Sequence, residues 1–495
     1  SPSSPPRWAT KFGGAARSRY CDGADCVILT HSHLPAVITV MHGPRCSGPP
    51  NRRDFLRAGT LALGGLSLAD VAAARETSDD RSNRSVILFY QWGGPSHLET
   101  YDLKPEAPIE YRSVYRPIAT NVSGIEICEH FPRQAELADK IALVRSLHHE
   151  INIHNDAAIE VLTGKRPTQL DPTSSAKSEH PDFAMVASRV LGPHPDALPR
   201  YVAIPNALHM TRPNYVGAEH TSFVVGDPAG DDFAVPQFDV ATDQARDALD
   251  DRQQLLRRFD RWRRDLDLHG TLDGSDRFRE AAFRMLTSRK VAAAFDLNQE
   301  EEKLRDRYGR HRWGQSCLLA RRLAEAGVSV VTIYSNTPKN GPQFTNWDDH
   351  ADNAGRPGHF ADYMARRLPY MDEALAGLIS DIYQRGLDRQ ILVVAVGEFG
   401  RTPRISTRSA TGSTGRDHWP QAYSALLAGG GLRTGQVIGA TNSKGEYPAE
   451  RPLTPQDLLA TIYRHLSINP AQTLTDYAGR PVHILPSGQP ITELV

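Results

Sequence analysis

The sequence predicts an α/β fold in which helices cover both faces of a mostly parallel sheet. The first observation is a series of short apolar, β-branched runs, each followed by Gly, Pro or polar residues and then by a helical pattern. The second is that these runs are apolar at nearly every position, as strands buried on both faces are. Strands of this kind alternating with amphipathic helices are typical of α/β proteins.

The expected elements follow from these runs in chain order. The predicted strands are Ser85–Tyr90, Ile141–Val144, Tyr201–Ile204, Val328–Tyr334, Ile391–Val396 and Tyr423–Ala428. The predicted helices are Gln315–Ala326, which ends at the C-cap Gly327, and Phe360–Arg385, which has apolar residues at helical spacing. The segment Asp250–Leu266 carries both charge signs beside one apolar stripe, and we expect a helix on the domain surface there.

The N-terminal part has the layout of a Tat export signal. Arg52 and Arg53 precede the apolar run Ala58–Ala69, which is shorter than the ~20 residues that span a bilayer, and the small residues Ala72–Ala74 follow. We therefore expect residues 1–74, an N-terminal extension and signal peptide, to be removed. Residues 75–495 are expected to form a single periplasmic or secreted domain. Residues 165–245, rich in Pro, His, Asp and Ser, would be insertions at the rim of its sheet.

Charge and cysteine content limit the functions of the predicted mature chain. Residues 1–74 contain 8 Lys or Arg and 4 Asp or Glu, which leaves 49 basic and 54 acidic residues and a net charge of −5. This balance gives no electrostatic reason to expect nucleic acid or an anionic membrane as a partner. No second apolar run approaches membrane-spanning length. Cys128 and Cys317 remain, and either one disulfide or two buried thiols fits the sequence.

Metal-capable side chains follow several predicted strands. They are His97, His148, His149, His154, Asp348, Asp349, His350, Asp352, Glu398, Asp417 and His418, with Arg401 and Arg416 among them. In an open α/β sheet functional groups gather beyond the carboxyl ends of the strands. Imidazole and carboxylate ligands from separate loops suit zinc, manganese or iron, whereas an all-oxygen set suits calcium or magnesium. We expect a divalent metal ion, with zinc, manganese, iron and calcium as the candidates. A Tat substrate crosses the membrane folded, which suits cofactor loading before export.

Several longer motifs resemble the bacterial family called domain of unknown function 1501. They are Gly93–His97, Leu162–Gly164, Arg307–Gly309, Gly314–Arg322, Trp347–His350, Gly397–Pro403 and Gly415–Pro420. The resemblance runs from the twin-arginine segment to Val495. It implies membership of the alkaline phosphatase and sulfatase superfamily and a three-layer α/β/α sandwich.

The resemblance also implies roles for particular residues. Glu398 is similar to the metal-binding Asp of the superfamily's Asp-His-Gly turn, although Phe399 occupies the adjoining His position. His418 and His350 are similar to two His ligands of the phosphatase branch, and Asp348 would replace an Asp partner that falls on Asn346. The first strand ends in Gln91, Trp92 and Gly93 where the superfamily has a metal-binding Asp. His154 stands where sulfatases have their modified Cys, so no Cys, Ser or Thr is placed for covalent catalysis.

Three functions fit these observations. The first is an exported metal-dependent hydrolase of phosphate or sulfate esters that acts on a small anionic ester or a sulfated or phosphorylated glycan. Its metal ligands would be Asp348, His350, Glu398, Asp417 and His418. His154 would be a ligand, general base or nucleophile, and Arg401 or Arg416 would bind the anion. The second is a non-catalytic exported protein that binds a glycan or surface partner. The third is a metal-using oxidoreductase or carrier.

Overall fold

The computed structural model describes residues 83–230, 233, 288–335, 346–353, 356–357, 360–407 and 412–495, and the backbone of two further strands. The chain divides into two compact units, Ser1–Asp79 and Asp80–Val495. In the first unit, β1 (Arg17–Asp22) pairs antiparallel with β2 (Asp25–Thr30). The twin-arginine segment, the expected cleavage site and the expected helix Asp250–Leu266 lie outside the described residues. Export therefore stays a prediction.

An eight-stranded sheet forms the centre of the second unit. Its order is β18-β6-β17-β12-β3-β9-β7-β8. The strands are β3 (Ser85–Tyr90), β6 (Ile141–Leu147), β7 (Tyr201–Ile204), β8 (Phe223–Val224), β9 (Val330–Tyr334), β12 (Ile391–Val396), β17 (Tyr423–Gly429) and β18 (Gln436–Ile438). β17 runs antiparallel to both of its neighbours, and the other neighbouring pairs are parallel.

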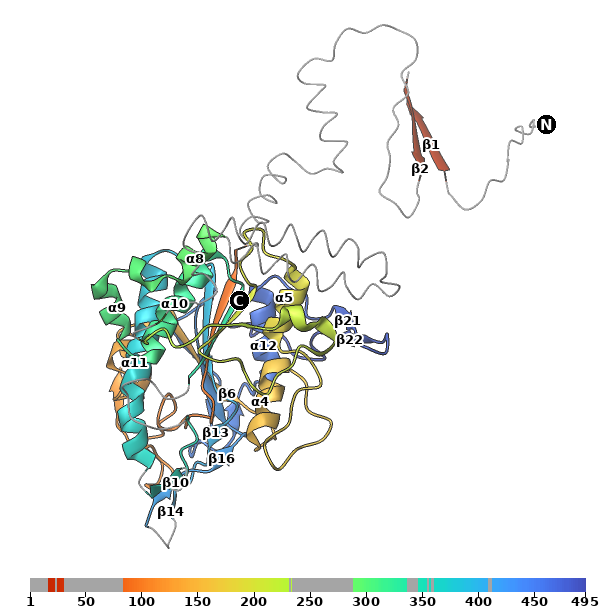
Figure 1. Ribbon diagram of the computed structural model, residues 1–495. Coiled ribbons are helices and arrows are strands. Elements are labelled where there is room, and N and C mark those ends of the chain that lie inside the picture. The colour runs from red at the N-terminus through yellow and green to blue at the C-terminus, as the bar shows by residue number, and fades with distance from the viewer. Residues whose placement is uncertain are drawn as a thin grey trace, which may run out of the picture. The chain divides into compact units, whose positions relative to one another are not determined.

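Helices lie on both faces of this sheet, with α8 to α11 on one side and α4, α5 and α12 on the other (Figure 1). The helices are α3 (Pro132–Ala135), α4 (His154–Thr163), α5 (Phe183–Leu191), α8 (Arg289–Phe295), α9 (Glu302–Tyr308), α10 (Arg312–Ala326), α11 (Phe360–Gln384) and α12 (Pro455–His465). Short 3₁₀ turns are η1 (Ala138–Lys140), η2 (Asn214–Val216), η3 (Ala218–His220) and η5 (Leu297–Gln299). Among the described residues, every helix is too short or too polar to traverse a bilayer.

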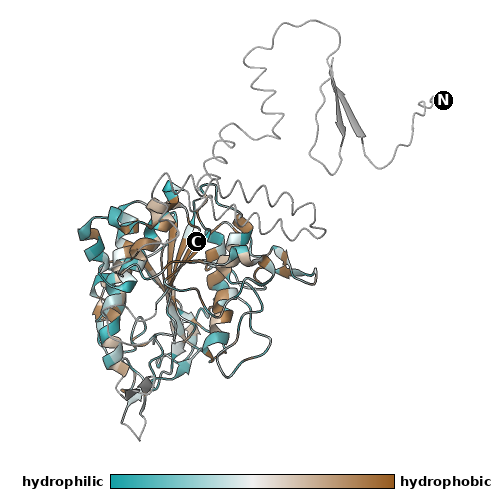
Figure 2. Cartoon of the chain, in the orientation of Figure 1, coloured by the Kyte–Doolittle hydropathy of each residue, from teal (hydrophilic) through white to brown (hydrophobic). Residues whose placement is uncertain are grey.

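Each sheet face has its own hydrophobic core, because successive side chains of a strand point to opposite faces. Phe89 of β3 packs with Trp313 of α10 in one core, their ring centroids 5.7 Å apart. Leu88, the preceding residue, lies in the other core with Leu162 of α4 and Leu459 of α12. Burying each such side chain contributes roughly 1.5–3 kcal/mol. Hydrophobic colouring is concentrated on the strands between the layers, whereas hydrophilic colouring covers much of the outer helices (Figure 2).

Short two-stranded ribbons decorate the sheet. They pair β4 (Pro117–Ala119) with β5 (Glu126–Cys128), β10 (Asp352–Asn353) with β11 (Arg356–Pro357), β13 (Gly400–Arg401) with β16 (His418–Trp419), β14 (Ser406–Thr407) with β15 (Thr414–Gly415), β19 (Ala440–Thr441) with β20 (Pro448–Glu450) and β21 (Thr473–Thr475) with β22 (Pro481–His483). Labels for β10, β13, β14 and β16 appear together at one end of the unit (Figure 1).

The predicted fold class is confirmed: the unit is a three-layer α/β/α arrangement with a mostly parallel central sheet. The strands Ser85–Tyr90, Tyr201–Ile204 and Ile391–Val396 have the predicted bounds. Gly327 adopts the left-handed conformation, with φ of 109°, that a C-cap requires. The structure adds the direction of β17, because an apolar run predicts a buried strand without giving its orientation.

The two cysteines of this unit are free thiols, and both are buried. Cys128 ends β5, and Cys317 lies on the inner face of α10. Burial raises the pKa of the Cys128 thiol to about 12 and also raises the pKa of Cys317. Since the thiolate is the reactive form, both side chains should be chemically inert in the folded protein.

A thiol-modification experiment tests this conclusion. In a variant with Cys21, Cys26 and Cys46 replaced by Ser, Cys128 and Cys317 are the remaining cysteines. We expect Ellman's reagent to find no reactive thiol in the native variant at pH 8 and two after denaturation in guanidinium chloride, because burial withholds both groups. Fast labelling of either cysteine without denaturant would contradict the buried arrangement.

Candidate metal centre

The candidate site lies where several parallel strands end. β3, β9 and β12 are adjacent and parallel, so their carboxyl ends meet at one edge of the sheet. Glu398 follows β12, and His154 begins α4 on the chain that leaves β6. Asp348 and His350 come from the segment after β9. In the ribbon of β13 and β16, Arg401 pairs with His418, which brings the last histidine to the same place.

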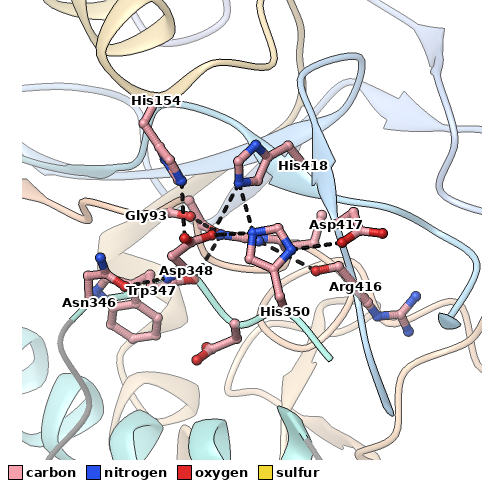
Figure 3. Close-up of polar contacts among 12 residues, drawn as sticks. Gly93, His154, Asn346, Trp347, Asp348, His350, Arg416, Asp417 and His418 are labelled. Carbon is pink, nitrogen blue, oxygen red and sulfur yellow. Dashed lines mark hydrogen bonds and ion pairs between the residues drawn. The ribbon is translucent and has the colours of Figure 1, made fainter. Parts of the chain in front are cut away.

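Three histidines point their Nε2 atoms at the carboxylate of Asp348 (Figure 3). Asp348 Oδ1 lies 2.8 Å from His350 Nε2 and 3.1 Å from His418 Nε2, and its Oδ2 lies 3.2 Å from His154 Nε2. The two imidazoles of His350 and His418 also face each other, with 3.0 Å between their Nε2 atoms. The side chains of the three histidines and Asp348 are between 15% and 27% exposed, so solvent reaches the cluster.

The other nitrogen of each imidazole is held by a hydrogen-bond acceptor. His154 Nδ1 is 2.8 Å from Glu398 Oε1, and His350 Nδ1 is 2.7 Å from Asp417 Oδ1. His418 Nδ1 is 2.7 Å from the carbonyl oxygen of Asn152. An ionised carboxylate and a carbonyl only accept, so each Nδ1 carries the hydrogen and each neutral imidazole presents its Nε2 lone pair. Metal-bound histidines in proteins are oriented in this way.

Imidazole lone pairs and a carboxylate that face one another repel each other unless a positive charge lies between them. Burial opposes charge on His154, but hydrogen bonds to Asp348 and Glu398 outweigh it and raise its pKa to about 9. Burial likewise opposes charge on His350, yet Asp348 and Asp417 raise its pKa. Burial lowers the pKa of His418. Without a cation, the cluster therefore draws protons onto His154 and His350, and a metal ion would displace them.

Asp348 is fixed by a buried arginine. The Arg401 side chain is 1% exposed, and its Nη2 is 2.6 Å from Asp348 Oδ1. The same guanidinium donates to the carbonyls of Gly93, Gly94, Trp347 and Arg416. Burial would raise the pKa of Asp348, but Arg401 and the histidines hold it well below its usual range. The carboxylate therefore stays ionised.

Glu398 and Asp417 lie behind histidines and not at the ligand positions that the sequence predicts for them. Glu398 is fully buried behind His154, where its carboxylate accepts from Gly93 N at 2.7 Å and from the Tyr90 hydroxyl at 3.2 Å. Asp417 lies on the outer side of His350 and is 56% exposed. Each carboxylate orients a histidine. The sequence showed these acids close to the right strand ends but could not show that an imidazole would stand between them and the centre.

The structure does not support the anion-binding roles expected for the two arginines. Arg401 uses its guanidinium on Asp348 and backbone carbonyls, as described above. Arg416 is fully buried, and its Nη2 lies 2.9 Å from the Glu99 carboxylate. It also donates to the carbonyls of Thr402, Pro403 and Arg112. Its side chain is directed away from the histidines (Figure 3). All three nitrogens of the Arg401 guanidinium and both Nη atoms of Arg416 therefore have internal partners, whereas the buried Arg416 Nε has none among the described residues.

Aromatic side chains form a wall beside the cluster that the sequence analysis did not include. The ring of Trp92 lies 5.3 Å from that of His154, 4.8 Å from that of His209 and 6.3 Å from that of Tyr334. Phe399 packs against His154 and His418 at 5.0 and 4.5 Å. The sequence could have indicated this wall only through position, because Trp92 and Tyr334 stand at the ends of β3 and β9.

The donor set fits a transition metal ion. His154, Asp348 and His418 each offer one ligand atom, and these atoms lie within 4.8 Å of one another. His350 contacts two members of this group. Zinc is bound by imidazole and carboxylate at about 2.0–2.2 Å, and neighbouring ligand atoms in a tetrahedral shell are then roughly 3.3–3.6 Å apart. The separations of 2.8 to 3.2 Å between Asp348 and the three Nε2 atoms are hydrogen-bond distances a few tenths of an ångström shorter than that spacing.

Comparison with known proteins places the chain in a family. Residues 83–495 match the family described as "Protein of unknown function (DUF1501)", and the chain belongs to it. None of the curated proteins matches the sequence.

Among solved structures, the chain is similar to the PsFucS1 sulfatase from Pseudoalteromonas sp., with a TM-score of 0.33 and 11% identity, over 85% of this chain and 72% of that one. It is also similar to the phosphonate monoester hydrolase SpPMH from Silicibacter pomeroyi, with a TM-score of 0.33 and 11% identity, over 83% of this chain and 76% of that one. A third similar structure is the lipoteichoic acid synthase LtaP from Listeria monocytogenes, with a TM-score of 0.34 and 9% identity, over 85% of this chain and 82% of that one.

Substitution of Gly93 tests how the backbone supports Asp348. Gly93 has φ of +109°, and a Cβ there would collide with the backbone of Trp347 and Asp348. We expect Gly93→Ala to lower the free energy of unfolding by ~2 kcal/mol or more and to weaken metal binding, because strain and overpacking act together. Gly124→Ala is the matched control, since Gly124 has φ of +81° and open space around it. If urea unfolding showed the same loss of unfolding free energy in both variants, the close approach of Gly93 to the backbone of Trp347 and Asp348 would be contradicted.

Proposed function

We propose that this member of the family is an exported, metal-dependent hydrolase of phosphate or sulfate esters. The observation that supports this most is the convergence of His154 Nε2, His418 Nε2 and the Asp348 carboxylate, each held by a second partner. His350 stands beside this group. Imidazole and carboxylate donors favour zinc, manganese or iron over calcium, which prefers oxygen ligands alone. A bound ion of this kind supplies a Lewis acid that polarises a phosphoryl or sulfuryl oxygen and lowers the pKa of water.

The remaining residues of the site position these groups. Glu398 and Asp417 fix the orientation and tautomer of His154 and His350 through their Nδ1 atoms. Arg401 keeps Asp348 ionised and in place. A nucleophilic role for His154 is disfavoured, because both of its ring nitrogens already contact carboxylates.

The aromatic wall gives the proposed substrate an organic part. Trp92 is part-exposed and lies next to the imidazole of His154, and the exposed His209 packs against Trp92. Flat aromatic rings pack against the apolar face of a sugar or another ring, so the ester would be that of a cyclic alcohol such as a glycan unit. Among the described residues, Arg401 and Arg416 direct their guanidinium groups to internal partners, so the metal ion would hold the charged group of the substrate.

A second function is favoured by one observation. Arg401 and Arg416 are both used internally, and no Ser, Thr or Cys occupies position 154. A non-catalytic protein that uses its metal and aromatic wall to bind a glycan or surface partner would also have these features. Turnover separates the two functions: metal-loaded protein that binds such esters without cleaving them would favour the binding role.

Metal content tests the proposed centre directly. We expect the full-length chain to hold about one transition metal ion per molecule by mass spectrometry, and His154→Ala or His418→Ala to lose nearly all of it, because each removes a ligand. Glu398→Gln and Asp417→Asn should weaken binding by about 10- to 100-fold, since they disturb ligand orientation only. His148→Ala, which removes a histidine outside the cluster, is the control. Full metal content in His418→Ala would overturn the assignment.

The aromatic wall is tested with paired substrates. We expect Trp92→Ala to lower kcat/KM for a 4-nitrophenyl ester or a sugar ester by about fivefold to tenfold, which corresponds to the ~1 kcal/mol of one aromatic contact. The same variant should hydrolyse methyl phosphate or methyl sulfate as the unaltered protein does, because these esters have no ring. Tyr477→Ala removes a distant aromatic side chain that is 83% exposed and serves as control. Equal losses for ring and methyl esters would assign Trp92 to the structure of the site.

A further inference from the structure

Three titratable side chains from separate segments form a second cluster. Lys165 follows Gly164, the C-cap of α4, while His180 precedes α5 and Tyr215 lies in η2. Lys165 Nζ donates to Tyr215 Oη at 3.4 Å, and Tyr215 Oη lies 3.2 Å from His180 Nδ1. The His180 and Tyr215 rings also meet edge to face, with centroids 5.8 Å apart. All three side chains are part-exposed, so a small molecule has access to them.

The hydrogen bonds of this cluster can form a continuous chain. The Lys165 amine donates to Tyr215 Oη, and in the His180 tautomer that is protonated on Nε2 the Tyr215 hydroxyl donates to His180 Nδ1. His180 is then the acceptor at the end of the chain and carries its own hydrogen on Nε2. A proton that leaves the Lys165 nitrogen can pass through the Tyr215 hydroxyl to the imidazole.

Lys165 differs from other lysines in its surroundings. Lys104, Lys140 and Lys290 each contact a carboxylate, at 3.1, 2.8 and 2.5 Å. Within the described residues, no carboxylate lies at ion-pair distance from Lys165 Nζ. A lysine without a counter-ion in a partly desolvated place loses its proton more easily than an exposed one.

The pKa values of the three side chains follow from this geometry. Burial lowers the pKa of Lys165 to about 8, from an ordinary value near 10.4. Burial also lowers the pKa of His180, and the charge of Lys165 lowers it further against the opposing effects of Glu179 and Asp476. Burial and Asp476 raise the pKa of Tyr215 to about 12, so its hydroxyl keeps its hydrogen. At neutral pH a fraction of the amine is therefore neutral beside a neutral imidazole.

We propose that Lys165 is a nucleophilic amine that binds small aldehydes or ketones covalently, with Tyr215 and His180 as its proton relay. The Lys165 nitrogen forms a bond to the carbonyl carbon, and its proton passes through Tyr215 to His180. The carbonyl oxygen, which now carries the former π electrons, takes that proton back from His180 and becomes a hydroxyl group. A second proton from the relay lets the hydroxyl leave as water while the nitrogen lone pair forms the C=N bond. The remaining N–H proton then returns to the relay, so both amine hydrogens leave in the water. The product is an imine, so no oxidant, reductant or other reactant is needed.

This site is independent of the proposed metal centre. His154 begins α4 and Lys165 follows its end, and a helix of ten residues is about 15 Å long. Loss of the metal ion would leave Lys165, Tyr215 and His180 in place. Failure of one proposal therefore does not affect the other.

Reductive trapping tests the proposal on the full-length chain. The protein is incubated with propanal and cyanoborohydride at pH 7.5, and N-propyl groups are located by peptide mass spectrometry. We expect Lys165 to be labelled at least tenfold faster than the exposed lysines Lys177 and Lys303. If exposure alone set the labelling rate, Lys165 would be labelled most slowly, because it is the most buried of the three lysines. Labelling of Lys165 at the rate of the exposed lysines, or more slowly, would overturn the proposal.

Variants separate the relay from burial alone. Tyr215→Phe and His180→Gln should each reduce the labelling rate of Lys165 to within about twofold of the rates at Lys177 and Lys303, which should not change. Tyr111→Phe is the matched control, because Tyr111 also lies beside a lysine, Lys444. Thermal unfolding shows that each variant is folded. If either relay variant fails to fold, the other gives the same test. An undiminished rate at Lys165 in a folded variant would overturn the relay.

Discussion

The ion pair of Arg401 with Asp348 is the interaction on which the rest of the site depends. The guanidinium is buried and joins the turn after β3, through Gly93 and Gly94, to the segment after β9, through Trp347 and Asp348. A buried guanidinium is costly to desolvate, so each of its donors needs a partner. Here the partners are backbone carbonyls of two loops. The arginine therefore fixes loop positions and also presents the carboxylate toward which the three imidazoles point.

The charge balance of the site explains why a divalent ion suits it. Asp348, Glu398 and Asp417 bring three negative charges, and Arg401 brings one positive charge. With neutral imidazoles the cluster has a net charge of −2, although Glu398 is fully buried. Uncompensated charge in such a place is expensive. Two extra protons on the histidines or one divalent cation would restore neutrality, and only the cation also uses the converging Nε2 lone pairs.

The sequence predicts the layers of this fold better than the site within it. Apolar runs locate β3, β7 and β12 to the residue, because burial on both faces leaves a continuous signal. Strand-end position also identifies His154, Asp348 and His418 as neighbours. The partner of each polar group is a long-range property, however. Arg416 forms its ion pair with Glu99, which lies more than 300 positions away in the chain, and no local pattern around Arg416 indicates that it is buried.

The two ends of α4 show that local surroundings decide the charge of a side chain here. The positive end of a helix dipole disfavours a cation, and the negative end favours one, by about 0.3–1 kcal/mol. His154 stands at the positive end, yet Asp348 and Glu398 raise its pKa to about 9, which corresponds to about 3 kcal/mol. Lys165 follows the negative end, yet burial without a carboxylate partner lowers its pKa to about 8. In both places the specific neighbours outweigh the dipole. Acidic side chains gather at the carboxyl edge of the sheet, whereas no carboxylate of the described residues lies at ion-pair distance from the Lys165 amine. One helix therefore supports a cation-binding imidazole at one end and an amine of lowered pKa at the other.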